Sequence, residues 1–350
     1  SGSRTIKLVD RTFNADRRRA LKILRFIAGE YGGRIARGVS FHFEVAGDLL
    51  DGPALELVAG APAGLFQFEI GLQSMDERAL RLARRKTDMA HLTRQVSRLI
   101  ACGRAHVHLD LIAGLPGEGL AEFARGFDAA YALRPHTLQL GFLKLLHGSA
   151  MREDPDTYPC RFDENPPYEV RETPWLSAAD LQTLKLAERA LDKLHNSGRF
   201  VCTLRWLTTA GGHTPFALFL ALGETIARAE AGGGSLSLDA LTDLVAEHLF
   251  ARHPDKAALL RDLLLRDRLA SVKTTLLPAS LKRRDARYHA IKRALEKRFP
   301  RQENTPRAIG LLYAGEEDQV VFCDYLQPDP VTGLYDLQVM PVAQLLASRE

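Results

Sequence analysis

Residues 106–118 read HVHLDLIAGLPGE. The segment begins with apolar, β-forming residues, reaches an acidic side chain at Asp110, and then enters a glycine-rich turn that opens a helix. Glycine lets the backbone approach a ligand closely, and the first turn of a helix leaves backbone N–H groups unpaired. The segment therefore predicts a buried strand that is followed by a ligand-binding turn.

Four other short apolar runs lie within the first 145 residues, separated by helical patterns such as Ala15–Tyr31 and Asp76–Cys102. Strands and helices that alternate in this way predict right-handed βαβ units and a parallel sheet. Because the strands read as continuous apolar runs, we expect both faces of the sheet to be covered, as in a barrel or a doubly wound sheet. The predicted strands are Thr5–Val9, Val39–Val45, Leu65–Ile70, His106–Ile112 and Thr137–Phe142.

Polar side chains lie at or near the carboxyl ends of these strands. In parallel α/β folds this edge of the sheet is where ligands bind. Any α/β protein places some polar groups there, so their positions alone do not establish a site. The residues are Asp10, Glu44, Glu69, Gln73 and Asp110.

The pattern changes after residue 147. Residues 148–176 hold five prolines and few periodic positions, which predicts a connector or lid. From Ser177 the chain turns helical, with Ser177 as N-cap and Asp180 completing a capping box. We expect a barrel domain over 4–147 and a helical accessory domain over 177–350. Its predicted helices are 177–196, 214–231, 236–251, 254–270 and 280–298, and Gln319–Gln327 with Gly333–Val339 predict a terminal β-hairpin.

The composition is that of a globular protein, with 46% hydrophobic and 26% charged residues among 350. No run of 18 apolar residues and no signal-peptide pattern occur, so we expect a cytoplasmic protein without a membrane partner. The cysteines lie too far apart for a disulfide framework or a CxxC metal pair, and free thiols are expected. They are Cys102, Cys160, Cys202 and Cys323.

Several segments, taken in order, resemble those of the radical S-adenosylmethionine (SAM) enzymes. They match strands two to six of a partial radical SAM barrel: VDRTFN at 9–14, FEVAGDLL at 43–50, FEIGLQS at 68–74, DLIAGLPGE at 110–118 and LQLGFLKLL at 138–146. PPYEVRETPWLS at 166–177 and NSGRF at 196–200 are similar to a group with an N-terminal cobalamin-binding domain and a C-terminal region of unknown function. The resemblance implies an α/β fold, in which a partial parallel (β/α) barrel precedes a mostly helical domain.

The resemblance also implies a set of SAM-binding residues. In the coproporphyrinogen-dehydrogenase-like type, polar side chains at strand ends contact SAM, and Glu44, Gln73 and Asp110 match them. An arginine after the GLQS segment pairs with the SAM carboxylate, which a guanidinium can hold with two hydrogen bonds. Arg85 matches that arginine, with Arg84 as a substitute. The other implied contacts are Ile112 and Gly114 against the adenine, Phe142 closing over it, and Asp10, Thr12 and Asn14 near the methionine amino group.

The sequence departs from the family where the iron–sulfur cluster is expected. Radical SAM catalysis uses a CxxxCxxC loop after the first strand, whose three thiolates hold a 4Fe-4S cluster. No two cysteines lie closer than 42 residues, so the chain offers no recognisable ligands for this cluster or for cobalamin. We expect the chain alone to be inactive, with the cluster loop in sequence outside it or truly lacking.

For the complete protein the resemblance implies reductive cleavage of SAM to a 5′-deoxyadenosyl radical. The radical would act on a small-molecule or otherwise unknown substrate, with electrons from a donor such as flavodoxin or ferredoxin. The alternative is a SAM- or nucleotide-binding module without a cluster, which acts as a regulator or scaffold. A CxxxCxxC motif upstream of Ser1 would favour the enzyme.

Some of these residues also have a simpler interpretation. Arg85 belongs to the basic run 81–86, so a solvated helix face is the alternative to a ligand contact. Glu69 is equally well explained by a hydrogen-bonded core position. The strand histidines His42, His106 and His108 have no spacing that favours a metal site.

Residues 280–301 form a basic cluster, with nine Lys or Arg against Asp285 and Glu296. Such a cluster suits nucleic acid, and some radical SAM enzymes modify transfer RNA. A basic helix is more often merely solvated, and the formal charge of the chain is only +4. Solvation is therefore the favoured interpretation of the sequence.

Overall fold

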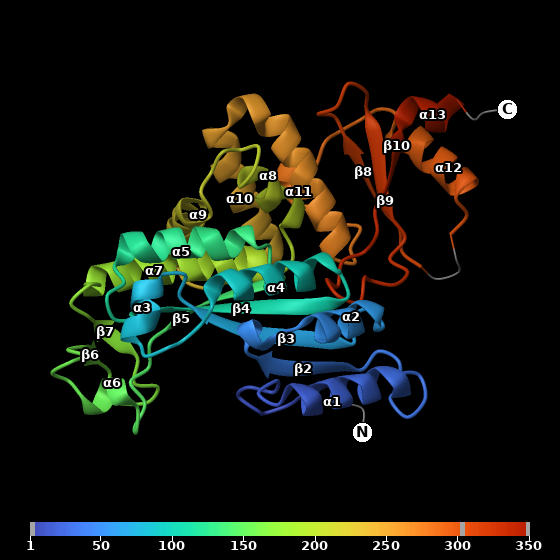
Figure 1. The fold of residues 1–350 in the computed structure, drawn as a ribbon. Coiled ribbons are helices and arrows are strands. Elements are labelled where there is room, and N and C mark those ends of the chain that lie inside the picture. Colours follow the sequence, from blue (N-terminus) through green and yellow to red (C-terminus); the bar gives the residue numbers. More distant parts are fainter. Residues whose placement is uncertain (1–3, 302–304, 348–350) are drawn as a thin grey trace. The chain divides into compact units, whose positions relative to one another are not determined.

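The computed structural model describes residues 4–301 and 305–347, which fall into two compact units (Figure 1). The first unit is Ser1–Asp192 together with Thr214–Leu220, and the second is Lys193–His213 together with Ala221–Glu350. The division into a barrel, a connector and a helical domain stays a prediction. Among the described residues, no helix is both long enough and apolar enough to cross a membrane.

The first unit is built on a sheet of five parallel strands in the order β1-β2-β3-β4-β5. The strands are β1 Thr5–Lys7, β2 Ser40–Val45, β3 Phe66–Gln73, β4 Ala105–Ala113 and β5 Thr137–Phe142. Sequential order with right-handed crossovers places the connecting helices on one side of the sheet, as in part of a (β/α) barrel. The predicted partial parallel barrel is confirmed.

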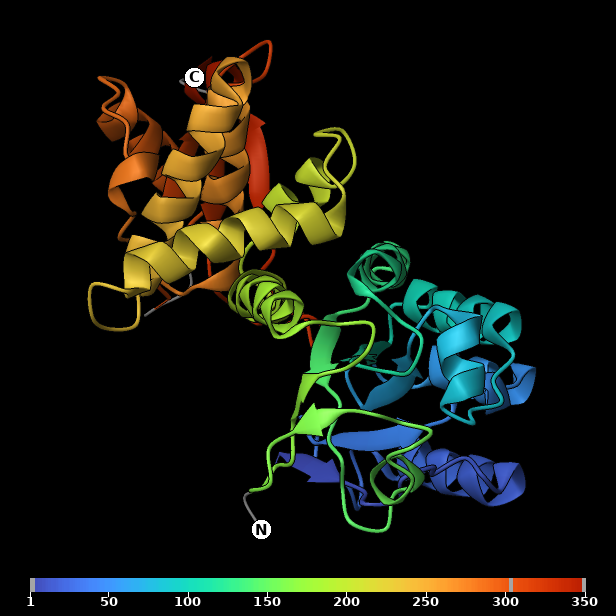
Figure 2. The same ribbon diagram turned by 90° about the vertical axis from the view of Figure 1, so that its left-hand side faces the viewer.

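The connecting helices gather on one side of this sheet (Figure 2). They are α1 Arg17–Glu30, the 3₁₀ turn η1 Gly47–Leu49, α2 Gly52–Gly60, α3 Glu77–Leu82, α4 Met89–Ala101 and α5 Leu120–Ala132. Asp16, Asp51, Asp76 and Asp88 cap α1 to α4, each accepting a hydrogen bond from a backbone N–H of the first turn. These bonds satisfy donors that the start of a helix leaves unpaired.

The single helical segment predicted over Asp76–Cys102 is wrong, because the structure divides it into α3 and α4. Arg84 follows α3 with a φ of +56°, a left-handed backbone conformation that ends the helix. Asp88 then caps α4. The break turns Arg85 back toward the sheet, where its Nη2 donates to the Gly71 carbonyl at 2.9 Å.

Side chains along β2, β3 and β4 alternate between a buried apolar face and a half-buried face that is mostly polar. On the apolar face, Phe43, Phe68, Val107 and Leu109 are at most 2% exposed. The expectation that both faces are covered is wrong for these strands, because their burial alternates and the inner-face side chains are only half-buried. A partial barrel covers its outer face with helices. We call this inner surface the polar face.

The proline-rich segment folds against the end of β5. It contains α6 Ala150–Glu153 and a two-stranded antiparallel sheet of β6 Arg161–Phe162 and β7 Val170–Glu172. The Val170 N–H donates to the Leu143 carbonyl at 2.8 Å, which joins this segment to the residues after β5. The next helix, α7 Ala178–Ala190, begins with the predicted capping box of Ser177 and Asp180.

The second unit combines helices with a three-stranded antiparallel sheet in the order β10-β9-β8. The predicted terminal hairpin is confirmed, since β9 pairs with β10. The sequence did not predict β8, α8 or α13, and the predicted helix 280–298 begins earlier than α12. The strands are β8 Ala308–Leu312, β9 Gln319–Cys323 and β10 Gln338–Pro341; the helices are α8 Val201–Leu207, α10 Leu238–Arg252, η3 Pro254–Lys256, α11 Ala257–Ser271, η4 Ala279–Leu281, α12 Tyr288–Arg298 and α13 Val342–Ala347. Two further helices, η2 Leu191–Asn196 and α9 Pro215–Glu230, contain residues of both units.

Both faces of the second-unit sheet are buried. Leu265 and Leu269 of α11 pack with Val321 on one face. Ile291 and Leu295 of α12 pack with Phe322 on the other face, together with residues of α13. Burial on both sides explains why the sequence of β9, QVVFC, is a continuous apolar run after its first residue.

Candidate functional site

The polar face of the first unit arranges its side chains in rows across the strands. One row holds Glu44, Glu69, His108 and Thr137, which are neighbours in the parallel register. The next row toward the carboxyl ends holds Gly71, Asp110 and Gln139. Glu44 and Asp110, both predicted site residues, therefore share this face and lie in adjacent rows.

Glu69 is the centre of a charged group on the polar face. Its Oε2 accepts a hydrogen bond from Lys7 Nζ at 3.1 Å and lies 2.8 Å from His42 Nε2. Burial raises the pKa of Glu69, but Lys7 and His42 together lower it by more, so the pKa lies below its ordinary value. The Glu69 carboxylate is thus ionised and partnered at neutral pH, in accord with the hydrogen-bonded interpretation.

His108 and Asp110 form a second charged pair, with 2.9 Å between His108 Nε2 and Asp110 Oδ1. Both atoms are buried. Burial lowers the pKa of His108, but Asp110, followed by Glu69 and Gln139, raises it by more. The contact is therefore an ion pair that holds the Asp110 carboxylate beside His108.

A surface hollow at the ends of β3 and β4 brings together three of the predicted site residues, Gln73, Arg85 and Ile112. Leu80, Ala83, Arg84 and Leu115 complete its lining. Gln73 has a φ of +67° beside a β-bulge, and its Oε1 is buried without a hydrogen-bond partner. A bulge often redirects a side chain at the edge of a functional site.

Arg85 keeps its charge in this hollow. Burial lowers the pKa of Arg85, and the Asp48 carboxylate opposes that effect. An arginine pKa starts so high that the guanidinium stays protonated at neutral pH. Because Arg85 Nη2 is held by the Gly71 carbonyl, the cation is fixed beside Gln73 instead of moving freely in solvent. Arg85 is nonetheless exposed to solvent, and it lies in the loop between α3 and α4 instead of on a helix face.

The remaining polar candidates lie near the end of β2. Asn14 makes two hydrogen bonds with the backbone of Ala46, both 2.9 Å long: its Nδ2 donates to the carbonyl, and its Oδ1 accepts from the N–H. Both polar atoms of the side chain therefore have partners within the protein. Asp10 and Thr12 are exposed on the same loop. The Glu44 carboxylate is half-buried, and it has no hydrogen-bond or ion-pair partner among the described residues.

Gly114 and Phe142 do not join Gln73 in the hollow. Gly114 has a φ of +98°, and a Cβ at this position would lie 2.9 Å from the Val170 side chain. Its lack of a side chain thus serves contact with the proline-rich segment. Phe142 is buried on the apolar side of β5, with Lys185 Nζ 5.3 Å from its ring centre.

A buried pair that sequence analysis missed joins the two glycine-containing motifs. Ser74 Oγ, from GLQS, donates to Glu118 Oε1, from GLPGE, at 2.5 Å. Glu118 is 1% exposed, and its Oε2 has no hydrogen-bond partner. Burial raises the pKa of Glu118 to about 7, with Ser74 opposing and Asp76 and Glu122 adding to the rise. A glutamate in a turn gives no sequence signal for burial, so only the fold identifies this group.

The cysteines do not fit an iron–sulfur cluster. All four are free, in agreement with the sequence prediction. Burial raises the pKa of Cys160, Cys202 and Cys323, in the case of Cys202 to about 12, which disfavours the thiolate that binds iron. Within residues 4–301 and 305–347, no group of three His, Cys, Asp or Glu side chains could hold a metal ion.

Comparison with known proteins gives one family match and several structural ones. A family model described as a protein of unknown function (DUF4080) matches residues 156–328, just under half of the chain. This match agrees with the predicted C-terminal region of unknown function. A comparison with curated proteins finds no match.

Two solved structures illustrate the structural similarity. The first is coproporphyrinogen III oxidase (HemN) from Escherichia coli, a radical SAM enzyme, with 17% identity and a TM-score of 0.32 over 37% of this chain and 29% of that chain. The second is the radical SAM methyltransferase TsrM from Kitasatospora setae, solved with cobalamin and a [4Fe-4S] cluster. Its identity is 16% and its TM-score 0.36, over 40% of this chain and 26% of that chain. The present chain spans less than a third of either protein.

Proposed function

We propose that the hollow at the ends of β3 and β4, with the adjoining polar face, binds SAM. The supporting observation is that Gln73, Arg85 and Ile112 gather in one hollow in which the buried Gln73 Oε1 lacks a partner. A buried acceptor without a hydrogen bond costs about 1–3 kcal/mol. A ligand that carries hydroxyl or amino donors would remove that cost.

The side chains around the hollow suit the separate parts of SAM. Arg85 offers a fixed cation for the methionine carboxylate, and Ile112 offers an apolar surface for the adenine. The Asp110 carboxylate, which His108 holds in place, and the Glu44 carboxylate on the neighbouring polar face would accept from the ribose hydroxyls or the amino group. In this proposal Asn14 holds the end of β2 in place. The other candidates lie outside the hollow and would not line it: Asp10, Thr12, Gly114 and Phe142.

We further propose that the complete protein is a radical SAM enzyme acting on a small molecule. Bound SAM would supply a 5′-deoxyadenosyl radical when reduced, and the residues of this chain would hold and orient it. The cysteines present do not fit the cluster, so its ligands, and any cobalamin-binding domain, would belong to sequence outside these 350 residues. An electron donor such as flavodoxin or ferredoxin would serve that larger protein.

Calorimetric titration of the chain with SAM tests the binding proposal. We expect Gln73→Ala and Asp110→Asn each to weaken binding by roughly fivefold or more, the value of one hydrogen bond. Gln67→Ala is the matched control, because Gln67 lies on the same face of β3 and already donates to Ser40. Equal effects of Gln67→Ala and Gln73→Ala, or no saturable binding of SAM, would contradict the proposal.

Titration with adenosine triphosphate separates the enzyme from the alternative module. A nucleotide that displaces SAM, and that depends on the same two side chains, would favour a nucleotide-binding regulator or scaffold. Selective binding of SAM and S-adenosylhomocysteine would favour the radical SAM assignment.

A further inference from the structure

The positive charge of the chain is concentrated in one segment of the second unit. Residues 280–301, here the basic segment, hold nine Lys or Arg and two acidic residues. The rest of the chain holds 38 Lys or Arg and 41 Asp or Glu, so its formal charge is slightly negative. The modest total of +4 therefore hides a strong local asymmetry, which is the electrostatic pattern of polyanion binding.

The two acidic residues of the basic segment do not neutralise it. Asp285 is engaged by Arg287, at 3.0 and 2.7 Å, and by the Tyr313 hydroxyl. Glu296 accepts from Arg301 at 3.3 Å. Six exposed basic residues have no ion-pair partner among the described residues: Lys282, Arg283, Arg284, Lys292, Arg293 and Lys297.

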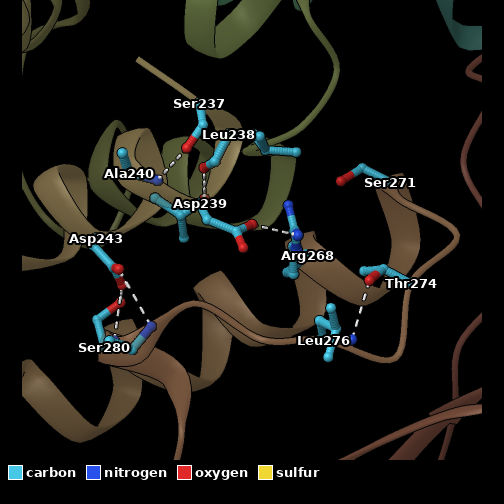
Figure 3. Close-up of polar contacts among 12 residues, drawn as sticks. Ser237, Leu238, Asp239, Ala240, Asp243, Arg268, Ser271, Thr274, Leu276 and Ser280 are labelled. Carbon is cyan, nitrogen blue, oxygen red and sulfur yellow. Dashed lines mark hydrogen bonds and ion pairs between the residues drawn. The ribbon is translucent and has the colours of Figure 1, made fainter.

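The fold holds the basic segment firmly in place. Ile291 and Leu295 of α12 are 0% exposed, packed against the second-unit sheet. At the other end, Asp243 of α10 accepts hydrogen bonds from the Ser280 N–H at 2.8 Å, the Ser280 hydroxyl at 2.6 Å and the Ala279 N–H at 3.2 Å (Figure 3). The cationic side chains therefore project from a fixed backbone, which limits the ordering that binding a ligand would require.

The basic segment also carries an exposed tyrosine and borders a surface hollow. His289, Arg293 and Lys297 follow one another at intervals of four residues, so they form a ridge along one side of α12. Arg293 and Lys297 also border a surface hollow whose lining includes Ala294 and Leu345. Tyr288, at the start of the helix, is 37% exposed, with its ring beside His289. An exposed ring next to cations can stack on a nucleic-acid base.

We propose that α12 and the residues before it bind single-stranded nucleic acid. Lys and Arg side chains would contact the phosphates, and Tyr288 would stack on an unpaired base. The alternative polyanion, an anionic membrane surface, is less suited, because the apolar stripe that a membrane-binding helix needs is buried inside the protein. This interaction lies wholly in the second unit and does not depend on SAM binding.

Fluorescence anisotropy with a labelled 12-nucleotide single-stranded RNA tests the interaction at 50, 100 and 200 mM KCl. For single strands, log K falls with log salt by about 0.7 for each phosphate that is neutralised. The double variant Arg293→Ala/Lys297→Ala should reduce that slope by about 1.4 and weaken binding about tenfold at 50 mM. Arg18→Ala/Arg19→Ala is the charge-matched control, since both side chains are exposed on α1 in the first unit.

The aromatic contact has its own test. Tyr288→Ala should weaken RNA binding by roughly fivefold or more, while Tyr288→Phe, which keeps the ring, should not. Several outcomes would overturn the proposal: no saturable RNA binding at 50 mM KCl, equal losses in the two double variants, or tighter binding to duplex than to single strands. Binding to phosphatidylserine vesicles without binding to RNA would overturn it as well.

Discussion

Glu118 should make the first unit less stable as the pH rises from 4.5 to about 7. In the folded chain the pKa of Glu118 is raised from 4.5 to about 7, so between these values the folded state binds a proton that the unfolded state releases. Stability falls with pH wherever the folded state binds more protons. At about 1.4 kcal/mol per pKa unit, the loss across this window is about 3 kcal/mol.

The variant Glu118→Gln isolates this effect, because a neutral amide of the same shape does not titrate. The amide also places an unpaired donor where Oε2 lies, but that cost does not depend on pH. We therefore expect the difference in unfolding free energy between variant and parent to move by about 3 kcal/mol in favour of the variant between pH 4.5 and pH 8. All other titrating groups are common to both proteins and cancel in the difference.

Urea denaturation followed by tryptophan fluorescence measures this difference. The chain has two tryptophans, Trp175 in the first unit and Trp206 in the second. In a Trp206→Phe background, Trp175 alone reports the unit that contains Glu118. Parallel stability curves for parent and Glu118→Gln from pH 4.5 to pH 8 would refute the reasoning, because they would mean that Glu118 titrates alike in both states.

Gly114→Ala should destabilise the first unit by about 1–3 kcal/mol in urea denaturation, and the added change Val170→Ala should recover only part, because the left-handed φ remains. Asn14→Ala should cost about 1–3 kcal/mol in the same assay, since it leaves the Ala46 N–H and carbonyl unpaired; a loss below 0.5 kcal/mol would be too small for two buried bonds. Burial lowers the pKa of His248 to about 4, so the second unit should lose stability as the pH falls from 6.5 to 4. In a Trp175→Phe background, His248→Gln should remove about 1–2 kcal/mol of that loss, an amount discounted for the partial exposure of His248. If the variant loses as much stability as the parent between pH 6.5 and pH 4, His248 is not the group responsible.

Local patterns were sufficient to predict the strands and the main helices. Each of the five predicted strands overlaps an observed one, because a buried β-strand needs a run of β-forming residues that is visible in the sequence. The Ser177 capping box was predictable for the same reason, since its two partners are three residues apart. The elements that were predicted wrongly depend on features that local sequence patterns do not show. The helix break at Arg84 depends on a left-handed backbone conformation, which is usually predicted from a glycine, and no glycine occurs there. The apolar sequence of β8 also suits other secondary-structure elements.

The half-buried inner face follows from an alternation that the apolar content of a run such as HVHLDL conceals. Its His and Asp residues fall on alternate positions, so the run is in fact an alternating strand with one polar side. Sequence could place Gln73 and Ile112 near one edge, as parallel strands end together, whereas Arg85 was predicted there only by the family resemblance. It could not show that the proline-rich segment packs on Gly114, since that contact joins residues far apart in the chain.

The Ser74–Glu118 pair gives a physical reason for the short distance between the two motifs in the fold. Ser74 follows Gln73 directly, and Glu118 ends the turn that begins two residues after Ile112. Their hydrogen bond therefore joins the two backbone segments that carry different walls of the hollow, with Gln73 on one segment and Ile112 and Leu115 on the other. A solvated loop could not hold these walls in register, whereas a buried bond between the loops can, at the cost of a carboxyl group kept out of water. The buried Glu118 is therefore a structural support of the edge that carries the hollow.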